Sequence, residues 1–205
     1  GARSSLLVGS SDGLGARASI ALPVPGNWML TQWSPALKRL VATPPTFQGA
    51  YAANPDSAGV APRIIPGLGG LLGHCTVSPD GRWAAYVTNE GGGAPQVYVQ
   101  SLTGTPGRWQ ISTDFGTWPR WTKGGSEIVY ESQPDLMAVS IDTRDGFHPG
   151  TPHPLFICPT RGSGTVNYWT CTADGERFYV LQGPRAAVSG SIEVVTNFAA
   201  LVNRR

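Results

Sequence analysis

One short stretch recurs four times along the chain, as Trp33-Ser34-Pro35-Ala36-Leu37, Val77-Ser78-Pro79-Asp80-Gly81, Trp121-Thr122-Lys123-Gly124-Gly125 and Cys171-Thr172-Ala173-Asp174-Gly175. The copies begin 44, 44 and 50 residues apart, a period that is typical of the four-stranded blades of a β-propeller. In the second copy Pro79 presets the φ angle of its turn position, Asp80 tolerates the next position, and Gly81 suits the last. The stretch therefore predicts a tight turn between two strands.

Alternating apolar residues follow each turn and predict a strand there. The pairs are Leu40 and Ala42, Ala84 and Tyr86, Ile128 and Tyr130, and Phe178 and Val180. Each pair points to one face of its strand, because side chains alternate across a strand. Outer strands are predicted at Arg63-Ile64-Ile65, Trp109-Gln110-Ile111 and Leu155-Phe156. A β-sandwich also suits short strands joined by Gly/Pro turns, but a register kept through four copies favours an all-β propeller of four-stranded antiparallel blades.

The composition fits a folded all-β protein and gives no sign of nucleic-acid binding. The 205 residues include 27 Gly, 18 Pro and 7 Trp, and only 14% are charged, which is not a disordered composition. A net charge of +2 provides no clustered basic footprint. The sequence has no run of the roughly 18 apolar residues that a membrane span needs.

The cysteines and histidines predict no metal site. Three of each are scattered along the sequence without the spacing of a ligand set, and no cofactor motif accompanies them. Cys158 and Cys171 could pair if the loop between them folds back. Alternatively, Cys75, Cys158 and Cys171 are all buried or free thiols.

Several stretches resemble the TolB-like (WD40-like, PD40) propeller in the C-terminal region of bacterial eukaryotic-like serine/threonine protein kinases. The resemblance runs from about Cys75 to the end and is carried by Ser78-Pro79-Asp80-Gly81-Arg82-Trp83, Trp109-Gln110-Ile111-Ser112-Thr113-Asp114, Pro119-Arg120-Trp121 and the closing Ile192-Glu193-Val194-Val195-Thr196-Asn197-Phe198. It implies a six-bladed ring, a protein or peptide partner, and an extracytoplasmic location, either periplasmic or at the cell surface.

The chain is shorter than six blades of about 40–45 residues each. We therefore expect a single propeller domain of four to five blades, divided into a partial blade over 1–32, blades over 33–76, 77–120 and 121–170, and a last blade with the C-terminal tail over 171–205. An open ring exposes strand edges. A C-terminal fragment of a longer protein is the favoured explanation, with a smaller ring or a second copy as the alternatives.

Two short motifs of catalytic proteins occur but are better explained as turns. Asp114-Phe115-Gly116 spells a kinase motif, yet the other kinase motifs are missing from the sequence. Gly9-Ser10-Ser11-Asp12-Gly13 fits the hydrolase pattern G-x-S-x-G, but no helical periodicity follows it. We therefore predict that this chain is not an enzyme.

A binding site is expected at the mouth of the central channel, where the innermost strands begin. The residues expected to contact a partner are His74, Trp118, Arg120, Tyr168 and Trp169, because Trp, Tyr and Arg supply most of the binding energy at interfaces. Arg120 has a structural alternative, which is to pair with a carboxylate in the neighbouring blade. Trp121 is expected to pack between blades.

The predicted function is a non-catalytic protein- or ligand-binding propeller, the sensor or interaction part of a kinase-like or TolB-like bacterial protein. The alternative is the gating propeller of a prolyl-oligopeptidase-type peptidase whose hydrolase domain is absent from this chain. Both types of propeller share the Ser-Pro-Asp-Gly turn, so the upstream gene would distinguish them.

Overall fold

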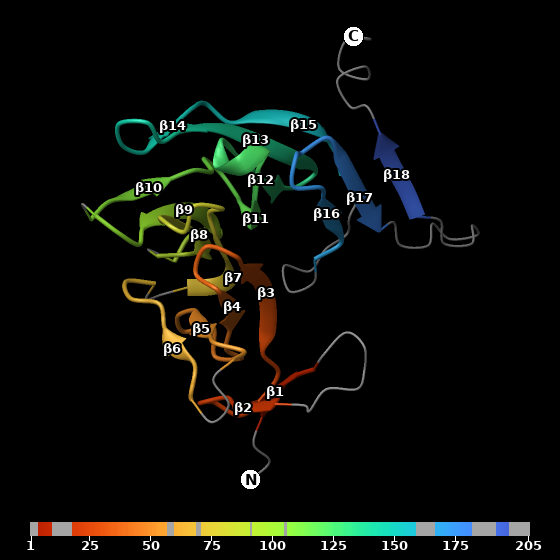
Figure 1. Ribbon diagram of the computed structural model, residues 1–205. Helices are drawn as coiled ribbons and strands as arrows, with labels where there is room; N and C mark the ends of the chain where they lie inside the picture. The colour runs from red at the N-terminus through yellow and green to blue at the C-terminus, as the bar shows by residue number, and fades with distance from the viewer. Residues whose placement is uncertain are drawn as a thin grey trace.

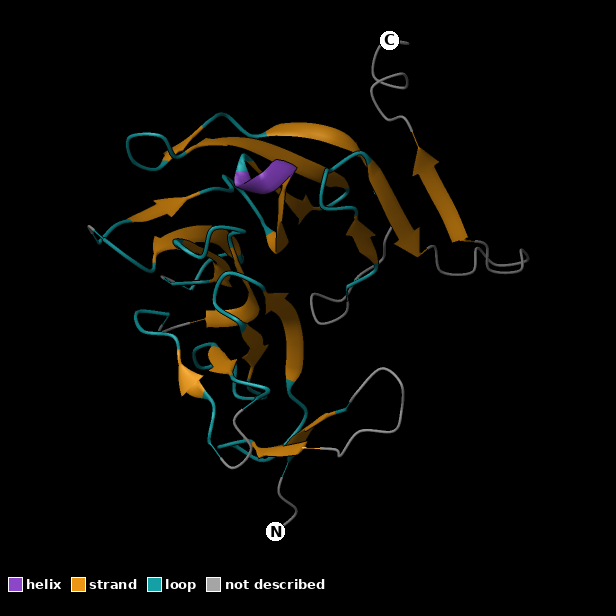
Figure 2. Cartoon of the chain, in the orientation of Figure 1, coloured by secondary structure: helices purple, strands orange, loops and turns teal. Residues whose placement is uncertain are grey.

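The protein is an all-β propeller built from consecutive antiparallel sheets (Figures 1 and 2). The computed structural model describes residues 4–9, 18–56, 60–68, 71–90, 92–104, 106–158, 167–181 and 192–196. The hydrolase-like stretch at 10–13 and the loop over 159–166 lie outside these residues. The strands are β1 (Ser5–Val8), β2 (Ala18–Ala21), β3 (Met29–Ser34), β4 (Arg39–Thr43), β5 (Tyr51–Ala53), β6 (Arg63–Ile64), β7 (Leu71–Val77), β8 (Trp83–Thr88), β9 (Gln96–Ser101), β10 (Arg108–Gln110), β11 (Thr117–Thr122), β12 (Glu127–Ser132), β13 (Asp135–Asp142), β14 (His148–Pro149), β15 (His153–Ile157), β16 (Trp169–Cys171), β17 (Arg177–Leu181) and β18 (Ile192–Thr196).

Each sheet after the β1–β2 hairpin is a meander that starts at its innermost strand. The order is β3-β4-β5-β6 in the first sheet and β7-β8-β9-β10 in the second. The third runs β11-β12-β13-β15, with β14 paired to the end of β13, and the fourth runs β16-β17-β18. The predicted outer strands are confirmed as β6, β10 and β15. A short 3-10 turn, Lys123–Gly125, is drawn purple in Figure 2.

The repeated stretch forms the turn between the first and second strands of its sheet. In the second copy the amide of Gly81 donates to the carbonyl of Ser78 over 2.9 Å, and Gly81 has a φ of 78° that favours glycine. The Ser78 hydroxyl donates to the carboxylate of Asp80 over 2.5 Å. In the fourth copy Thr172 donates in the same way to Asp174. The predicted β-turn is therefore confirmed, and its Asp anchors the hydroxyl that opens the turn.

The third copy keeps this arrangement with different residues. Gly124 stands where the second and fourth copies have Asp80 and Asp174. Glu127, at the start of β12, accepts the hydrogen bond from the Thr122 hydroxyl over 2.9 Å. The ammonium of Lys123 lies 2.7 Å from the other carboxylate oxygen. A carboxylate from the following strand thus replaces the one that the turn lacks.

The core lies between successive sheets, in three clusters of buried apolar residues. Tyr86 packs toward the first sheet and Val87 toward the third, since they point to opposite faces of β8. Ile128 and Tyr130 face the second sheet, and Phe178 faces the third. These residues are at most 2% exposed. The predicted alternating pairs of β8, β12 and β17 therefore point toward the preceding sheet.

Hydrogen bonds join the inner strands of neighbouring sheets. The Gln32 side chain of β3 donates to the carbonyl of Val77 over 3.0 Å and accepts from its amide over 2.6 Å. The Thr76 hydroxyl of β7 donates to the carbonyl of Pro119 over 3.3 Å, and the Trp121 indole donates back to the carbonyl of Thr76 over 3.4 Å. Trp121 also packs against the cluster between the second and third sheets, as expected.

The sheets follow one another around an arc, with β3, β7, β11 and β16 toward its inside (Figure 1). The β1–β2 hairpin lies at one end and β18 at the other. Across the described ranges, no extensive contact joins the hairpin to the last sheet. In the part of the chain that the structure describes, no helix has the length and apolar character of a membrane span.

Gln32→Leu is expected to lower the free energy of unfolding by about 2–6 kcal/mol. The change leaves the Val77 amide and carbonyl without their partner, and each unsatisfied buried group costs about 1–3 kcal/mol. Urea denaturation would measure the loss. Gln48→Leu, at an exposed position, is the matched control, and an equal loss in both variants would contradict the inter-sheet role of Gln32.

Candidate functional site

The inner strands of three sheets carry a β-bulge at the same place. The register shifts between Leu30 and Gln32 in β3, between Gly73 and Thr76 in β7, and between Thr117 and Arg120 in β11. A bulge inserts one residue, bends the strand and re-aims the side chains beside it. Three equivalent bulges thus present residues on the channel side of the propeller.

Two of these bulges hold a bulky residue in the left-handed backbone region. His74 has a φ of 58° and Trp118 a φ of 53°, values that are uncommon for any residue with a Cβ and exceptional for tryptophan. Such conformations cost about 1–3 kcal/mol each and gather at functional sites. Their rings stack, with centroids 3.3 Å apart and planes inclined by 21°. The strain therefore places two aromatic rings from adjacent sheets against each other.

The stacked pair lines a cavity of about 300 Å³. Met29 and Leu30 from β3 and Pro119 from β11 supply apolar wall, and Arg120 and Asn167 supply polar groups. Thr31 and Thr76 complete the lining. The cavity thus joins an aromatic surface, an apolar wall and one cation.

Arg120 occupies the position in β11 that Gln32 has in β3 and Thr76 has in β7. Those two side chains hydrogen-bond to the backbone of the next inner strand. The Arg120 guanidinium instead lies over the indole of Trp169 in β16, with its carbon 5.6 Å from the ring centroid. Its Nε is buried without a hydrogen-bond partner among the described residues, and no described carboxylate pairs with it. The described residues therefore do not show the alternative in which Arg120 pairs with a carboxylate of the neighbouring sheet.

Burial controls the charges of this site. Burial, followed by the nearby Arg120 charge, lowers the pKa of His74 to about 3, so this imidazole is neutral at physiological pH. Burial also lowers the pKa of Arg120 from its usual range, while the neighbouring Cys171 opposes that shift. The Nδ1 atom of His74 and the indole nitrogen of Trp169 are buried without partners among the described residues. Three nitrogens near the cavity are therefore buried and have no hydrogen-bond partner within the described ranges.

The structure brings together most of the residues that the sequence predicted. His74, Trp118 and Arg120 line one cavity, and Trp169, only 3% exposed, lies beneath Arg120. Tyr168 is not among the residues that line it. Sequence reasoning missed Asn167, whose side-chain oxygen accepts from the Trp169 amide over 3.0 Å. The sequence signal for this contact was the position of Asn167 two residues before the strand, because Asn side chains often hydrogen-bond to the backbone two residues on.

The other motifs and the cysteines do not form a catalytic or metal centre in the described residues. The carbonyl of Asp114 accepts from the Gln96 side chain over 2.7 Å in an exposed bend, as expected for a turn. Cys75 and Cys171 are thiols, and burial raises their pKa values to about 12 and about 11. Within the described ranges, no group of three or more His, Cys, Asp or Glu side chains could hold a metal ion.

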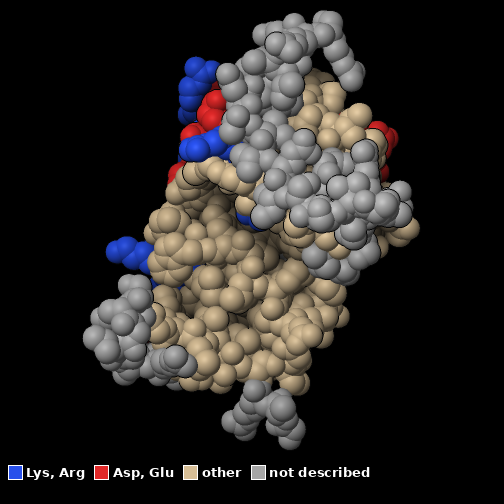
Figure 3. Space-filling model, turned by 90° about the vertical axis from the view of Figure 1, so that its right-hand side faces the viewer, with Lys and Arg blue, Asp and Glu red and all other residues tan. Residues whose placement is uncertain are grey.

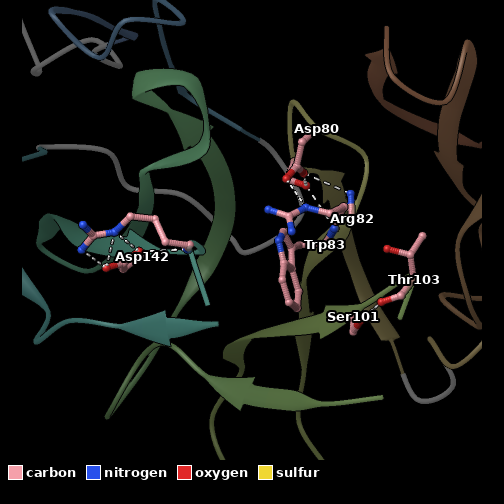
Figure 4. A network of polar contacts seen from close by, with 8 residues as sticks. Asp80, Arg82, Trp83, Ser101, Thr103 and Asp142 are labelled. Carbon is pink, nitrogen blue, oxygen red and sulfur yellow. Dashed lines mark hydrogen bonds and ion pairs between the residues drawn. The ribbon is translucent and has the colours of Figure 1, made fainter. Parts of the chain in front are cut away.

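A second cavity, of about 480 Å³, lies beside the turns of the second and third sheets. Asp80 and Asp142 line it, and each is held by an arginine two residues later (Figure 4). The Arg82 Nε lies 2.6 Å from Asp80, and an Arg144 Nη lies 2.5 Å from Asp142. These charges neutralise one another locally, so this cavity offers a ligand no uncompensated charge.

The comparisons with known proteins show the fold. Sequence comparison with protein families and with curated proteins finds no match. Among solved structures, the chain is similar to TolB from Acinetobacter baumannii, with a TM-score of 0.62 and 18% identity over 94% of this chain and 46% of that one. It is also similar to the β-propeller domain of Cps50 (Swd1) from Myceliophteria thermophila, with a TM-score of 0.52 and 11% identity over 89% of this chain and 64% of that one.

A third similar structure is named as an enzyme. It is a putative 6-phosphogluconolactonase from Bacteroides uniformis, with a TM-score of 0.50 and 15% identity over 95% of this chain and 65% of that one. The present chain spans about half the length of the TolB structure. These likenesses support a TolB-like and WD40-like propeller fold. What the protein binds must be argued from the residues of the site.

Acid is expected to destabilise the protein through His74. The folded protein keeps this imidazole neutral down to a pH of about 3, whereas an unfolded chain protonates it near pH 6.5. The stability that His74 contributes is therefore complete above pH 6.5 and is lost as the pH falls from there toward 3. At pH 5 the loss is about 2 kcal/mol, because each pKa unit corresponds to about 1.4 kcal/mol.

Urea denaturation at pH 7 and pH 5 would measure this loss. His74→Gln is expected to remove that part of the pH dependence, and His153→Gln, at an exposed position, is expected to retain it. An unchanged pH dependence in His74→Gln would show that the buried imidazole is not responsible.

Arg120→Met is expected to raise the free energy of unfolding, by about 0.5–2 kcal/mol, the usual range for stabilising changes. The substitution replaces a desolvated cation that has no carboxylate partner with an apolar chain of similar reach. Chemical denaturation would measure the change. A loss of stability would mean that the contact with Trp169 is the main role of Arg120.

Proposed function

We propose that this chain is a non-catalytic binding propeller that holds a protein or peptide at the mouth of its channel. The observation that carries the proposal is the strained and stacked pair His74 and Trp118, which come from adjacent sheets to line one cavity. Strain of this kind persists where the surroundings fix it and where a site uses it. The proposed partner contacts are His74, Trp118, Arg120 and Trp169, together with Tyr168, which directly precedes β16.

The surface around the channel agrees with recognition by aromatic and apolar groups. Among the described residues in Figure 3, few charged atoms lie on the lower part of the face, and most of the blue and red atoms lie in its upper half. Leu30 and Trp33 of β3 are 55% and 48% exposed. A face of this kind suits a peptide or protein partner better than a nucleic acid.

The biological setting that we propose follows from the sequence resemblance. It is the sensor or interaction part of a kinase-like or TolB-like bacterial protein, in a periplasmic or cell-surface location. The likeness to the TolB structure supports the TolB-like part of this setting. It carries no information on a kinase.

The rival proposal is a propeller that gates an enzyme or is part of one. The similar structure that is named as a lactonase supports this alternative. The described residues that line the channel cavity include no Ser, Cys, Asp or Glu, and the hydroxyls of Thr31 and Thr76 donate to backbone carbonyls. Among these residues His74 therefore has neither a carboxylate nor a hydroxyl hydrogen-bonded to it to form a catalytic pair. This observation favours binding over chemistry.

Selection from a random peptide library displayed on phage, followed by titration of the selected peptides, tests the proposal. We expect peptides whose affinity falls at least about tenfold in Trp118→Ala, because truncating a central aromatic contact typically costs more than 1 kcal/mol. Ile157→Ala is the matched control, since Ile157 is exposed on the outer strand β15 and lies outside the cavity lining. Selected peptides that bind Trp118→Ala as tightly as the natural chain would disprove a binding site at the channel mouth.

A further inference from the structure

The described lining of the channel cavity carries one positive charge and no negative one. Among these residues Arg120 is the only cation, and none is a carboxylate. His74 adds no charge at physiological pH, because burial holds its pKa near 3. The Cys171 thiol beside Arg120 also stays neutral, since burial raises its pKa to about 11. The described lining therefore presents a net charge of +1.

Arg120 differs from the ion-paired arginines of the described structure. The ion-paired arginines Arg82, Arg108 and Arg144 each contact a carboxylate. Arg120 is more enclosed than these and yet has none among the described residues. A desolvated charge is costly unless an opposite charge compensates it. Nothing in the described lining supplies that compensation, so the cavity is suited to a ligand that brings it.

We propose that Arg120 binds the carboxylate of the ligand, and that the apolar wall of the cavity holds the hydrocarbon or aromatic group next to that carboxylate. This inference rests on the proposed function and names the chemistry recognised by the same site. A guanidinium matches a carboxylate with a planar pair of donors. Met29, Leu30 and Pro119 provide the apolar wall, and Trp118 the aromatic face.

The charge of the cavity favours a carboxylate over a phosphate. A carboxylate carries one negative charge, which the single Arg120 cation balances. A phosphate monoester carries about 1.5–2 negative charges at neutral pH and would leave an unbalanced negative charge in a desolvated cavity. The volume, about 300 Å³, lies at the small end for ligand pockets. A cavity of this size suits the C-terminal residue of a peptide, or one acidic side chain together with an adjacent apolar residue of the peptide.

Three probes with one apolar body and different head groups test the inference, namely phenylacetate, phenylacetamide and phenyl phosphate. Binding would be followed by NMR through the indole N–H signals of Trp118 and Trp169, assigned with Trp118→Phe and Trp169→Phe. We expect phenylacetate to bind at least tenfold more tightly than phenylacetamide. Arg120→Gln is expected to remove this preference and Arg120→Lys to keep part of it. Arg63→Gln, at an exposed position on β6, is expected to retain it fully.

The outcomes separate this inference from the proposed function. Equal binding of acid and amide, or no shift with any probe, would overturn carboxylate recognition, while peptide selection against Trp118→Ala still decides whether the channel mouth binds. Tighter binding of phenyl phosphate than of phenylacetate would overturn the preference for a single charge. A preference that survives in Arg120→Gln would assign the recognition to another group. Circular dichroism of each variant confirms that it is folded.

Discussion

Apolar packing between consecutive sheets is the constraint on which the rest of this structure depends. The second strand of an internal sheet buries both of its faces, and all six residues of β8 are buried. One face of β8 packs on the sheet before it and the other on the sheet after it. Each large apolar side chain buried in this way contributes about 1.5–3 kcal/mol. Each sheet therefore depends on its neighbours more than on its own hydrogen bonds.

This packing also explains how the channel mouth can hold strained residues. The left-handed conformations of His74 and Trp118 together cost about 2–6 kcal/mol. The clusters on either side of β7 and β11 contain many fully buried apolar residues, so a few of them offset that cost. Hydrogen bonds from Gln32 to Val77 and from Thr76 to Pro119 then fix the inner strands beside the bulges. The site is rigid because the sheets that carry it cannot move apart without exposing their cores.

The fold could be predicted from the sequence, and the site only in part. Turn chemistry and alternation in each repeat depend on nearby residues, so the turn at Ser78–Gly81 and the facing of Tyr86 and Ile128 followed directly. The bulges at His74 and Trp118 could not be predicted, because a bulge is defined by the partner strand as well as by its own residues. The lack of a carboxylate for Arg120 is likewise a property of the assembled sheets. An arginine before the repeated stretch is visible in the sequence, but its unpaired state is not.

A comparison of equivalent positions shows why Arg120 points to function. Gln32 and Thr76 each join their sheet to the next one through hydrogen bonds with its backbone. A residue selected only for stability at the equivalent position of β11 is expected to form such a hydrogen bond as well. Arg120 makes no such bond in the described structure and has its Nε buried without a partner. Natural proteins retain such local costs mainly where activity requires them. Arg120 also lines the cavity beside the strained aromatic pair. The backbone strain of that pair and the buried, unpaired Nε of Arg120 therefore occur at the same site. Ligand recognition at the channel mouth explains both.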